Sequence, residues 1–201
     1  PVPGNTTETV FRHSDVAMYE AKREESEKNY ALFSPEMLEG YLNGVRLKRD
    51  FDQAINAHEL EVHFQPIKSM LSGDWYGFEA LVRWQHPTRG LLAPEEFIAL
   101  AEESGDILTI GEQVLRIACT DARRVTQGGR ELMLCVNVSS VQLQDERLVE
   151  MIRGVLNDTG WSPRRLTIEV PESALSADSA SAVSLLNGIR GLGVRVAVDD
   201  F

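Results

Sequence analysis

Four oxygen-bearing side chains stand at or near the ends of apolar runs in this sequence: Glu79, Asn137, Glu169 and Asp199. Three carboxylates and one amide, without Cys or His, favour hard divalent ions such as Mg²⁺, Mn²⁺ or Ca²⁺ over zinc. Asp200 follows Asp199 directly and offers a further carboxylate for a second ion. A pair of such ions suits phosphodiester hydrolysis.

Each of these residues also has an ordinary structural explanation. An Asp-Asp pair after a strand usually forms a turn or caps a helix. A single Glu in a strand commonly faces water at an edge, and an Asn after a strand commonly forms a turn. A shared site is favoured because the four residues follow successive apolar runs, whose ends would meet on one face of a barrel.

The segment around Glu79 adds a basic group to this set. Successive strand residues point to opposite faces, so Glu79, Leu81 and Arg83 share one face. An exposed ion pair of Arg83 would contribute little to stability. Facing inward beside an acid, the guanidinium fits a phosphate clamp better.

Hydrophobic periodicity predicts the elements that must position these residues. Strands are predicted over 61–67, 75–84, 132–138, 165–170 and 194–198. Helices are predicted over 14–29, 34–58, 94–104, 107–127, 145–159 and 178–190. The first two strands should pair antiparallel, because the short connection between them cannot hold a parallel crossover.

The later strands and helices alternate regularly. Asn137, Glu169 and Asp199 are 32 and 30 residues apart, which is one strand–helix unit per step and predicts parallel strands in an α/β fold. An open doubly wound sheet and a barrel both fit this alternation. We favour a (β/α)8 TIM-type barrel with one antiparallel strand, because polar residues end several strands and no glycine-rich phosphate loop follows the first parallel strand.

Composition narrows the class of protein. The 201 residues carry a formal net charge of −11, which argues against DNA, RNA or a membrane surface as a partner. Cys119 and Cys135 lie in apolar segments and are predicted to be reduced core residues. No apolar run reaches the roughly 18 residues of a membrane span, so we expect a cytoplasmic protein.

Five segments of the sequence resemble, in order, the conserved blocks of the EAL domain of bacterial cyclic di-GMP signalling. These are FQPI (64–67), EALVRWQHPTRGLLAPEEFIALAEESG (79–105), VNVSSVQL (136–143), TIEVPES (167–173) and VAVDDF (196–201). The upstream AMYEAK helix, with YALF after it, is similar to the closing helix of a GGDEF domain. We therefore expect residues 1–33 to be a GGDEF remnant and linker, and residues 34–201 to be the N-terminal part of an EAL barrel.

The resemblance implies a metal-dependent phosphodiesterase that opens cyclic di-GMP to linear pGpG. Its metal ligands would be Glu79, Asn137, Glu169, Asp199 and Asp200. Glu79, Asp199 and Asp200 would be the catalytic residues, and the dinucleotide would be bound by Gln65, Pro66, Leu81 and Arg83. Mg²⁺ or Mn²⁺ would support the reaction and Ca²⁺ would inhibit it. An upstream GGDEF-like domain and a second copy of the chain are the expected partners besides cyclic di-GMP.

Two departures from the family pattern keep an alternative open. Pro171 stands where the family usually has Thr, which removes a hydroxyl and a backbone donor beside the metal ligands. The resemblance also stops after the DDF motif at Phe201, with about five strands present, so we expect a piece of a longer protein that is inactive alone. The alternative is a degenerate EAL domain that binds cyclic di-GMP without cleaving it, and a purely structural scaffold is a third reading.

Overall fold

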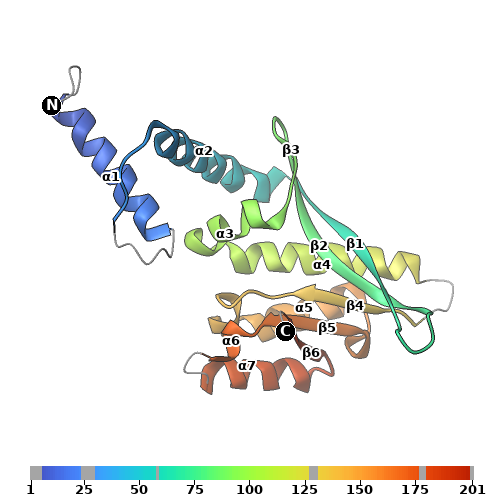
Figure 1. Ribbon diagram of the computed structural model, residues 1–201. Helices are drawn as coiled ribbons and strands as arrows, with labels where there is room; N and C mark the ends of the chain where they lie inside the picture. Colours follow the sequence, from blue (N-terminus) through green and yellow to red (C-terminus); the bar gives the residue numbers. More distant parts are fainter. Residues whose placement is uncertain (1–5, 24–29, 58, 127–130, 177–179, 200–201) are drawn as a thin grey trace. The chain divides into compact units, whose positions relative to one another are not determined.

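The computed structural model describes residues 6–23, 30–57, 59–126, 131–176 and 180–199. The chain divides into two units, Pro1–Gln53 and Ala54–Phe201. The first holds α1 (Thr7–Arg23) and most of α2 (Pro35–Ala57). The second holds every strand and the remaining helices, coloured from cyan to red in Figure 1.

The strands of the second unit are β1 (Leu60–Lys68), β2 (Trp75–His86), β3 (Gly90–Leu92), β4 (Met133–Asn137), β5 (Leu166–Pro171) and β6 (Arg195–Asp199). Its α-helices are α3 (Ile98–Ser104), α4 (Ile107–Val125), α5 (Leu148–Thr159), α6 (Ser173–Ser176) and α7 (Ala180–Gly191). Short 3-10 turns are η1 (Pro94–Glu96), η2 (Gln142–Gln144) and η3 (Pro163–Arg165). The predicted strands of this unit are present with ends shifted by one or two residues, whereas the helix predicted over 94–104 is divided into η1 and α3. Residues 127 and 178–179 of two further predicted helices lie outside the described residues.

In the first unit, the helix predicted over 14–29 begins earlier. α1 starts at Thr7 because the Thr6 side chain accepts a hydrogen bond from the Thr9 amide at 3.2 Å, which caps the helix. The end of the predicted range, 24–29, lies outside the described residues. Within the same unit, the rings of His13 and Phe33 stack with their centroids 3.7 Å apart.

The sheet order is β1-β2-β4-β5-β6, with β3 paired to the far end of β2. β1 and β2 are antiparallel, as the short connection between them predicts, whereas β2, β4, β5 and β6 are mutually parallel. The sequence prediction missed β3. It forms because the backbone amides of Thr88 and Arg89 donate to His86 Nδ1, which turns the chain back onto β2.

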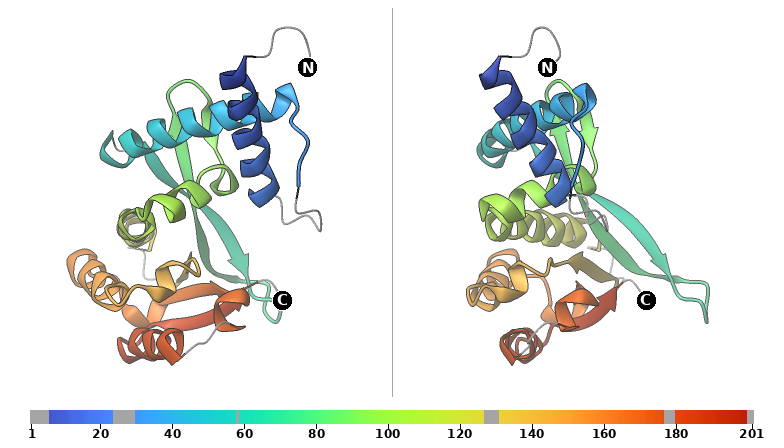
Figure 2. Two further views of the ribbon diagram at one scale, coloured as in Figure 1. Left: turned by 90° about the vertical axis from the view of Figure 1, so that its left-hand side faces the viewer. Right: turned by 60° about the vertical axis from the view of Figure 1, so that its left-hand side comes forward.

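One face of the sheet carries the hydrophobic core. Ala80, Leu134, Val136, Ile168 and Val170 point to this face and belong to one cluster of buried residues. α4, α5 and α7 supply the other side of the cluster and lie together on this face (Figure 2). Cys119 on α4 and Cys135 on β4 are both free thiols and both buried, as predicted.

The opposite face carries the polar residues that the sequence singled out. Residues paired in register point the same way, and Glu79 pairs with Cys135 while Asn137 pairs with Glu169. Ala197 follows Glu169 in the β5–β6 ladder. The alternation of side chains therefore separates an apolar face under the helices from a polar face across β2, β4 and β5.

Gly77 controls how closely β2 approaches β4. A Cβ atom at this position would collide with the main-chain carbonyl of Met133, its partner in register. Because that obstacle is backbone, we expect Gly77→Ala to lower the free energy of unfolding by at least about 2 kcal/mol. Thermal and denaturant unfolding measure the loss.

Gly154→Ala is the matched control, since a Cβ atom on Gly154 meets nothing within 4 Å and the residue lies within α5. This variant should keep or gain about 0.5–1 kcal/mol of stability. Equal stability of the two variants would contradict the close approach of β2 and β4.

Candidate functional site

The site is built around a side-chain contact between two neighbouring strands, β2 and β4. Asn137 Nδ2 donates a hydrogen bond to Glu79 Oε1 at 2.9 Å, joining the end of β4 to the middle of β2. Glu169 is half-buried and lies next to Asn137 in the β4–β5 ladder. Three of the five predicted metal ligands therefore share one face and neighbouring register positions. Since the amide nitrogen of Asn137 contacts Glu79, its oxygen is the atom suited to a cation.

The two aspartates are described only in part. Asp199 ends β6 and its backbone pairs with Pro171, so it follows Ala197 by two residues on the same strand. Nothing of its side chain is described, and Asp200 lies outside the described residues. Among the side chains that the structure does describe, no three of the His, Cys, Asp and Glu type come together as a metal site.

Cys135 lies between the two glutamates. It pairs with Glu79 on one side and with Thr167 on the other, and its side chain interacts with those of Glu169 and Thr167. Burial, with the nearby Glu169 carboxylate acting in the same direction, raises the pKa of the Cys135 thiol to about 12. The residue is therefore a neutral thiol below the acidic groups.

The predicted dinucleotide-binding residues divide between the two faces. Gln65 pairs with Glu79 and shares its face, whereas Pro66 pairs with Phe78 and lies on the other. Leu81 follows Glu79 by two residues on the same face. Arg83 lies two residues further, and its Nη1 donates to the Val82 carbonyl at 2.7 Å. The structure thus brings Gln65, Leu81 and Arg83 to the face of Glu79 but does not bring Pro66 there.

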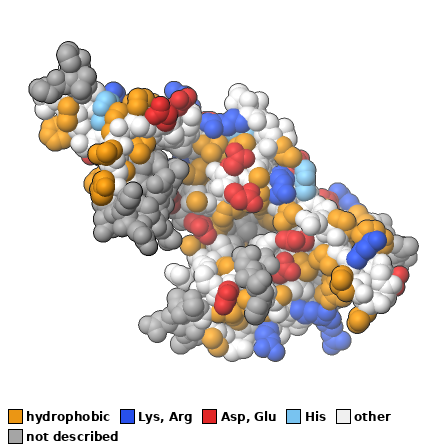
Figure 3. Space-filling model, in the orientation of Figure 1, with side chains coloured by type: hydrophobic (Ala, Val, Ile, Leu, Met, Phe, Trp, Pro, Cys, Tyr) orange, Lys and Arg blue, Asp and Glu red, His pale blue; other side chains and the backbone are white. Residues whose placement is uncertain are grey.

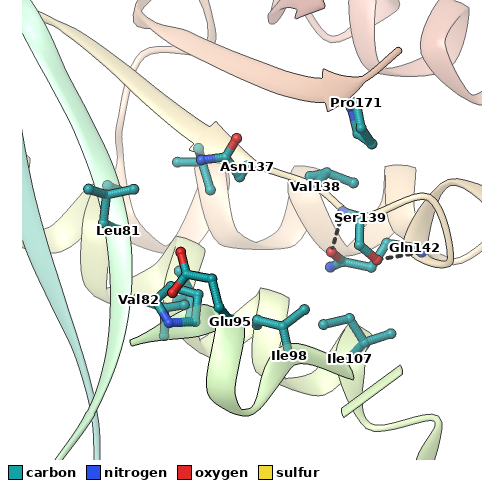
Figure 4. A pocket seen from close by; sticks show the side chains of 14 residues that line it. Leu81, Val82, Glu95, Ile98, Ile107, Asn137, Val138, Ser139, Gln142 and Pro171 are labelled. Atoms are coloured by element: carbon teal, nitrogen blue, oxygen red, sulfur yellow. Dashed lines mark hydrogen bonds between the residues drawn. The ribbon is translucent and has the colours of Figure 1, made fainter. Parts of the chain in front are cut away.

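A pocket of about 350 Å³ opens beside this face. The β2–β4 ladder ends at Ala80 and Val136, so the strands separate there and leave a wedge that η1, α3 and α4 close from below. Figure 4 shows the apolar lining of Leu81, Val82, Ile98 and Ile107, with Glu95 and Asn137 pointing toward the space.

The pocket includes polar residues that the sequence analysis did not single out: Glu95, Ser139 and Gln142. Gln142 Oε1 accepts a hydrogen bond from the backbone amide of Ser139 at 3.0 Å, and the backbone amide of Gln142 donates to Ser139 Oγ at 3.3 Å. This reciprocal pair, dashed in Figure 4, fixes the chain just after Asn137. These residues lie in motifs that are recognisable in the sequence. That they line one pocket depends on the separation of β2 from β4, which the sequence does not show.

Comparison with known proteins assigns this architecture. The model of the EAL domain family matches residues 48–201, which is most of the chain. The chain belongs to the EAL domain family.

The curated relatives that the chain matches are longer than it is. Cyclic di-GMP phosphodiesterase NbdA of Pseudomonas aeruginosa is 35% identical over 202 residues, with 100% of this chain and 26% of NbdA covered. Cyclic di-GMP phosphodiesterase PdeR of Escherichia coli is 33% identical over 201 residues, covering 100% of this chain and 30% of PdeR. The chain thus spans between a quarter and a third of their length.

Solved EAL structures share the fold. The PaMucR phosphodiesterase in complex with c-di-GMP is 36% identical with a TM-score of 0.74, covering 78% of this chain and 64% of that one. The EAL enzyme Bd1971 bound to cAMP and cyclic-di-GMP has a TM-score of 0.73 at 24% identity, and the match covers 99% of this chain and 52% of the Bd1971 chain. The described sheet β1-β2-β4-β5-β6 corresponds to part of the TIM barrel that these domains form, which confirms the predicted fold class.

The reactivity of the two buried thiols tests whether β4 is enclosed by its neighbouring strands and helices. Burial raises the pKa of Cys119 as well as Cys135 to about 12, so at pH 8 roughly one thiol in ten thousand is ionised. We expect iodoacetamide to leave both cysteines unmodified in the native protein and to alkylate both in denaturant. Peptide mass spectrometry measures each site separately. Rapid native alkylation of Cys135 would show that β4 is not enclosed by its neighbours.

Proposed function

We propose that this EAL domain hydrolyses cyclic di-GMP to linear pGpG with the help of divalent metal ions. The observation that carries the proposal is the Glu79–Asn137 contact at 2.9 Å, with Glu169 next to Asn137 in register. These oxygen-bearing side chains lie on the face that the helices leave uncovered, near the carboxyl ends of parallel strands. The similarity to cyclic di-GMP phosphodiesterases supports the choice of substrate.

The described part of the donor set fits a hard cation. Glu79, Asn137 and Glu169 offer carboxylate and amide oxygens, and the neighbouring Cys135 is held as a neutral thiol that does not compete as a thiolate. Asp199 and Asp200 are proposed to complete the set. Bound Mg²⁺ or Mn²⁺ would supply a nucleophilic water at neutral pH and offset the charge that develops on the phosphate oxygens. Ca²⁺ is proposed to inhibit.

The chain's own residues would bind and orient the dinucleotide. Arg83 lies four residues along β2 from Glu79, where its guanidinium can leave the Val82 carbonyl for a phosphate oxygen. The apolar pocket next to Leu81 offers walls for the flat face of a base. Glu95 at that pocket is an acceptor suited to the N–H groups on the edge of guanine. Gln65 is proposed to bind the ligand from β1.

The acidity of the protein does not oppose the binding of a dianion. The carboxylates that give this face its negative charge are the groups proposed to hold the cations, and bound divalent ions would reverse the local sign. Binding of cyclic di-GMP should therefore depend on the metal, unlike binding to a basic surface patch.

A non-catalytic receptor is the second candidate. Pro171 at the end of β5 lies opposite Asp199 in the β5–β6 ladder and has no amide hydrogen to donate. A metal ligand that lacks a hydrogen-bonding neighbour is held less firmly, which weakens metal binding more than nucleotide binding. This position is where the enzyme and the receptor would differ.

The domain context also remains a proposal. We propose that residues 1–33 end a GGDEF-like domain, that residues 34–201 belong to the EAL barrel, and that a second copy of the chain is a partner. The family match at 48–201 and the compact unit Ala54–Phe201 support an EAL barrel over most of the second segment. No helix among the described residues is long and apolar enough to cross a bilayer. A cytoplasmic location is proposed.

Glu79→Gln in the full-length protein tests the enzyme. We expect pGpG formation with Mg²⁺ or Mn²⁺, measured by chromatography, to fall by more than about a hundredfold, because the variant removes a proposed metal ligand. Glu150→Gln is the control, since Glu150 is exposed on α5 and pairs with Arg153 there. Absence of product from micromolar unmodified protein, with binding of cyclic di-GMP retained in calorimetry, would assign the receptor role instead.

Pro171→Thr tests the effect of the missing donor. Threonine restores a backbone N–H and adds a hydroxyl beside the end of β6. We expect the Mn²⁺ concentration for half-maximal activity to fall roughly 10-fold, with the KM for cyclic di-GMP less affected. Metal titration of the two proteins measures this difference, and an unchanged titration would mean that residue 171 does not influence the cation.

A further inference from the structure

Seven of the basic residues of the second unit lie at one end of its sheet. The helices run opposite to the parallel strands, so helix C-termini and strand N-termini meet at the same end. The basic residues of this end are Lys68, Arg123, Arg124, Arg164, Arg165, Arg190 and Arg195. We call these residues the basic end. Lysine and arginine side chains are visible along the lower and right-hand edges in Figure 3.

Some of these basic residues make contacts that stabilise the fold. Cations near helix C-termini offset the helix dipole, and Arg123 Nη1 donates to the Thr159 carbonyl at 2.6 Å. Arg124 pairs with Asp121, and Arg165 donates to the Leu132 carbonyl while its guanidinium lies over Trp161. These contacts position the three arginines. The described acidic residues of the same end are Asp74, Asp121, Glu131 and Asp158, fewer than its seven cations, so the basic end is locally positive in a chain of net charge −11.

The β1–β2 turn projects from the same end. Met70 is 99% exposed and Leu71 is 101% exposed, so two large apolar side chains stand side by side in water. The turn is ordered by hydrogen bonds from the Ser69 amide to Asp74 O at 2.9 Å and from the Gly73 amide to Ser69 O at 2.8 Å. β4 pairs with β2 only from Gly77 onward, so the turn extends beyond its neighbours, as Figure 2 shows.

Aromatic and basic groups follow directly behind these two residues. Trp75 and Tyr76 are each exposed by more than two-fifths. Lys68 Nζ lies 4.6 Å from the centre of the Trp75 ring, and Arg195 Nη1 donates to the Tyr76 hydroxyl at 3.0 Å. The order along the hairpin is thus an apolar apex, then aromatic rings, then cations.

We propose that the basic end binds the surface of an anionic lipid bilayer, with Met70 and Leu71 entering its apolar region. Trp and Tyr are favoured at the level of lipid headgroups, and Lys and Arg near such a surface are attracted to acidic lipids. A narrow convex apex suits insertion between lipids, whereas a protein partner would bury a broader complementary patch. The net charge disfavours a membrane for the chain as a whole, but the cations are concentrated where the apex lies.

This orientation is compatible with the proposed activity without depending on it. Glu79, Asn137 and Glu169 lie further along the strands, toward the carboxyl ends, while the basic end holds the N-terminal ends of β4, β5 and β6. A bilayer bound at the basic end would leave the candidate site facing water.

Vesicle flotation with the full chain tests the proposal. We expect the chain to bind phosphatidylglycerol vesicles at low salt, to bind phosphatidylcholine vesicles much less, and to lose binding as salt is raised. Replacing both apex residues, Met70→Ser with Leu71→Ser, should lower the partition coefficient about tenfold. Both side chains are fully exposed, so folding should be unaffected.

Leu91→Ser is the matched control, because Leu91 is an exposed leucine in the other hairpin, between β2 and β3. It should partition like the unmodified chain. The fluorescence emission of Trp75 should shift to shorter wavelength on binding. Trp84 and Trp161 are buried, so their emission should not change and the shift can be assigned to Trp75. Equal binding to both lipids, unchanged partition of the apex variant, or binding only to a protein partner would overturn the proposal.

Discussion

The ladder from β2 through β4 to β5 is the constraint on which the rest of the structure depends. Its register places Glu79 opposite Cys135 and Asn137 opposite Glu169, so three oxygen-bearing side chains, the first and last of them 90 residues apart in the chain, reach one face. A slip of one residue would turn these groups into the core beneath the helices. The absence of a side chain at Gly77, where β4 begins to pair, permits this register.

The two faces of the ladder have different physical roles. Under the helices, alternate strand residues are apolar and lose their contact with water, which stabilises the second unit. On the other face, the carboxylates of Glu79 and Glu169, the amide of Asn137 and the guanidinium of Arg83 lie outside this core, and Asn137 donates a hydrogen bond to Glu79. The pocket beside Leu81 arises where these two regions meet, because β2 leaves β4 after Ala80.

The two ends of the sheet also differ in charge. Acidic side chains near the carboxyl ends of the strands suit cations, and arginines at the opposite end follow the C-termini of the helices. A single α/β arrangement thus produces both a proposed metal site and a basic end. The same arrangement separates the proposed membrane-binding end from the proposed ligand site.

The sequence by itself determined the α/β class, the antiparallel first pair and the strands that carry the polar residues, because hydrophobic periodicity and connection length are local properties. It did not show that Glu79 lies in the middle of β2. The sequence motifs also indicated the EAL domain family. Only the tertiary structure decided that Pro66 turns away from Glu79, that Glu95 and Gln142 join a pocket, and that Met70 and Leu71 stand in water beside arginines. These facts depend on which strands pair, where they separate and how far a hairpin extends, and such relations between distant segments are not encoded in local spacing.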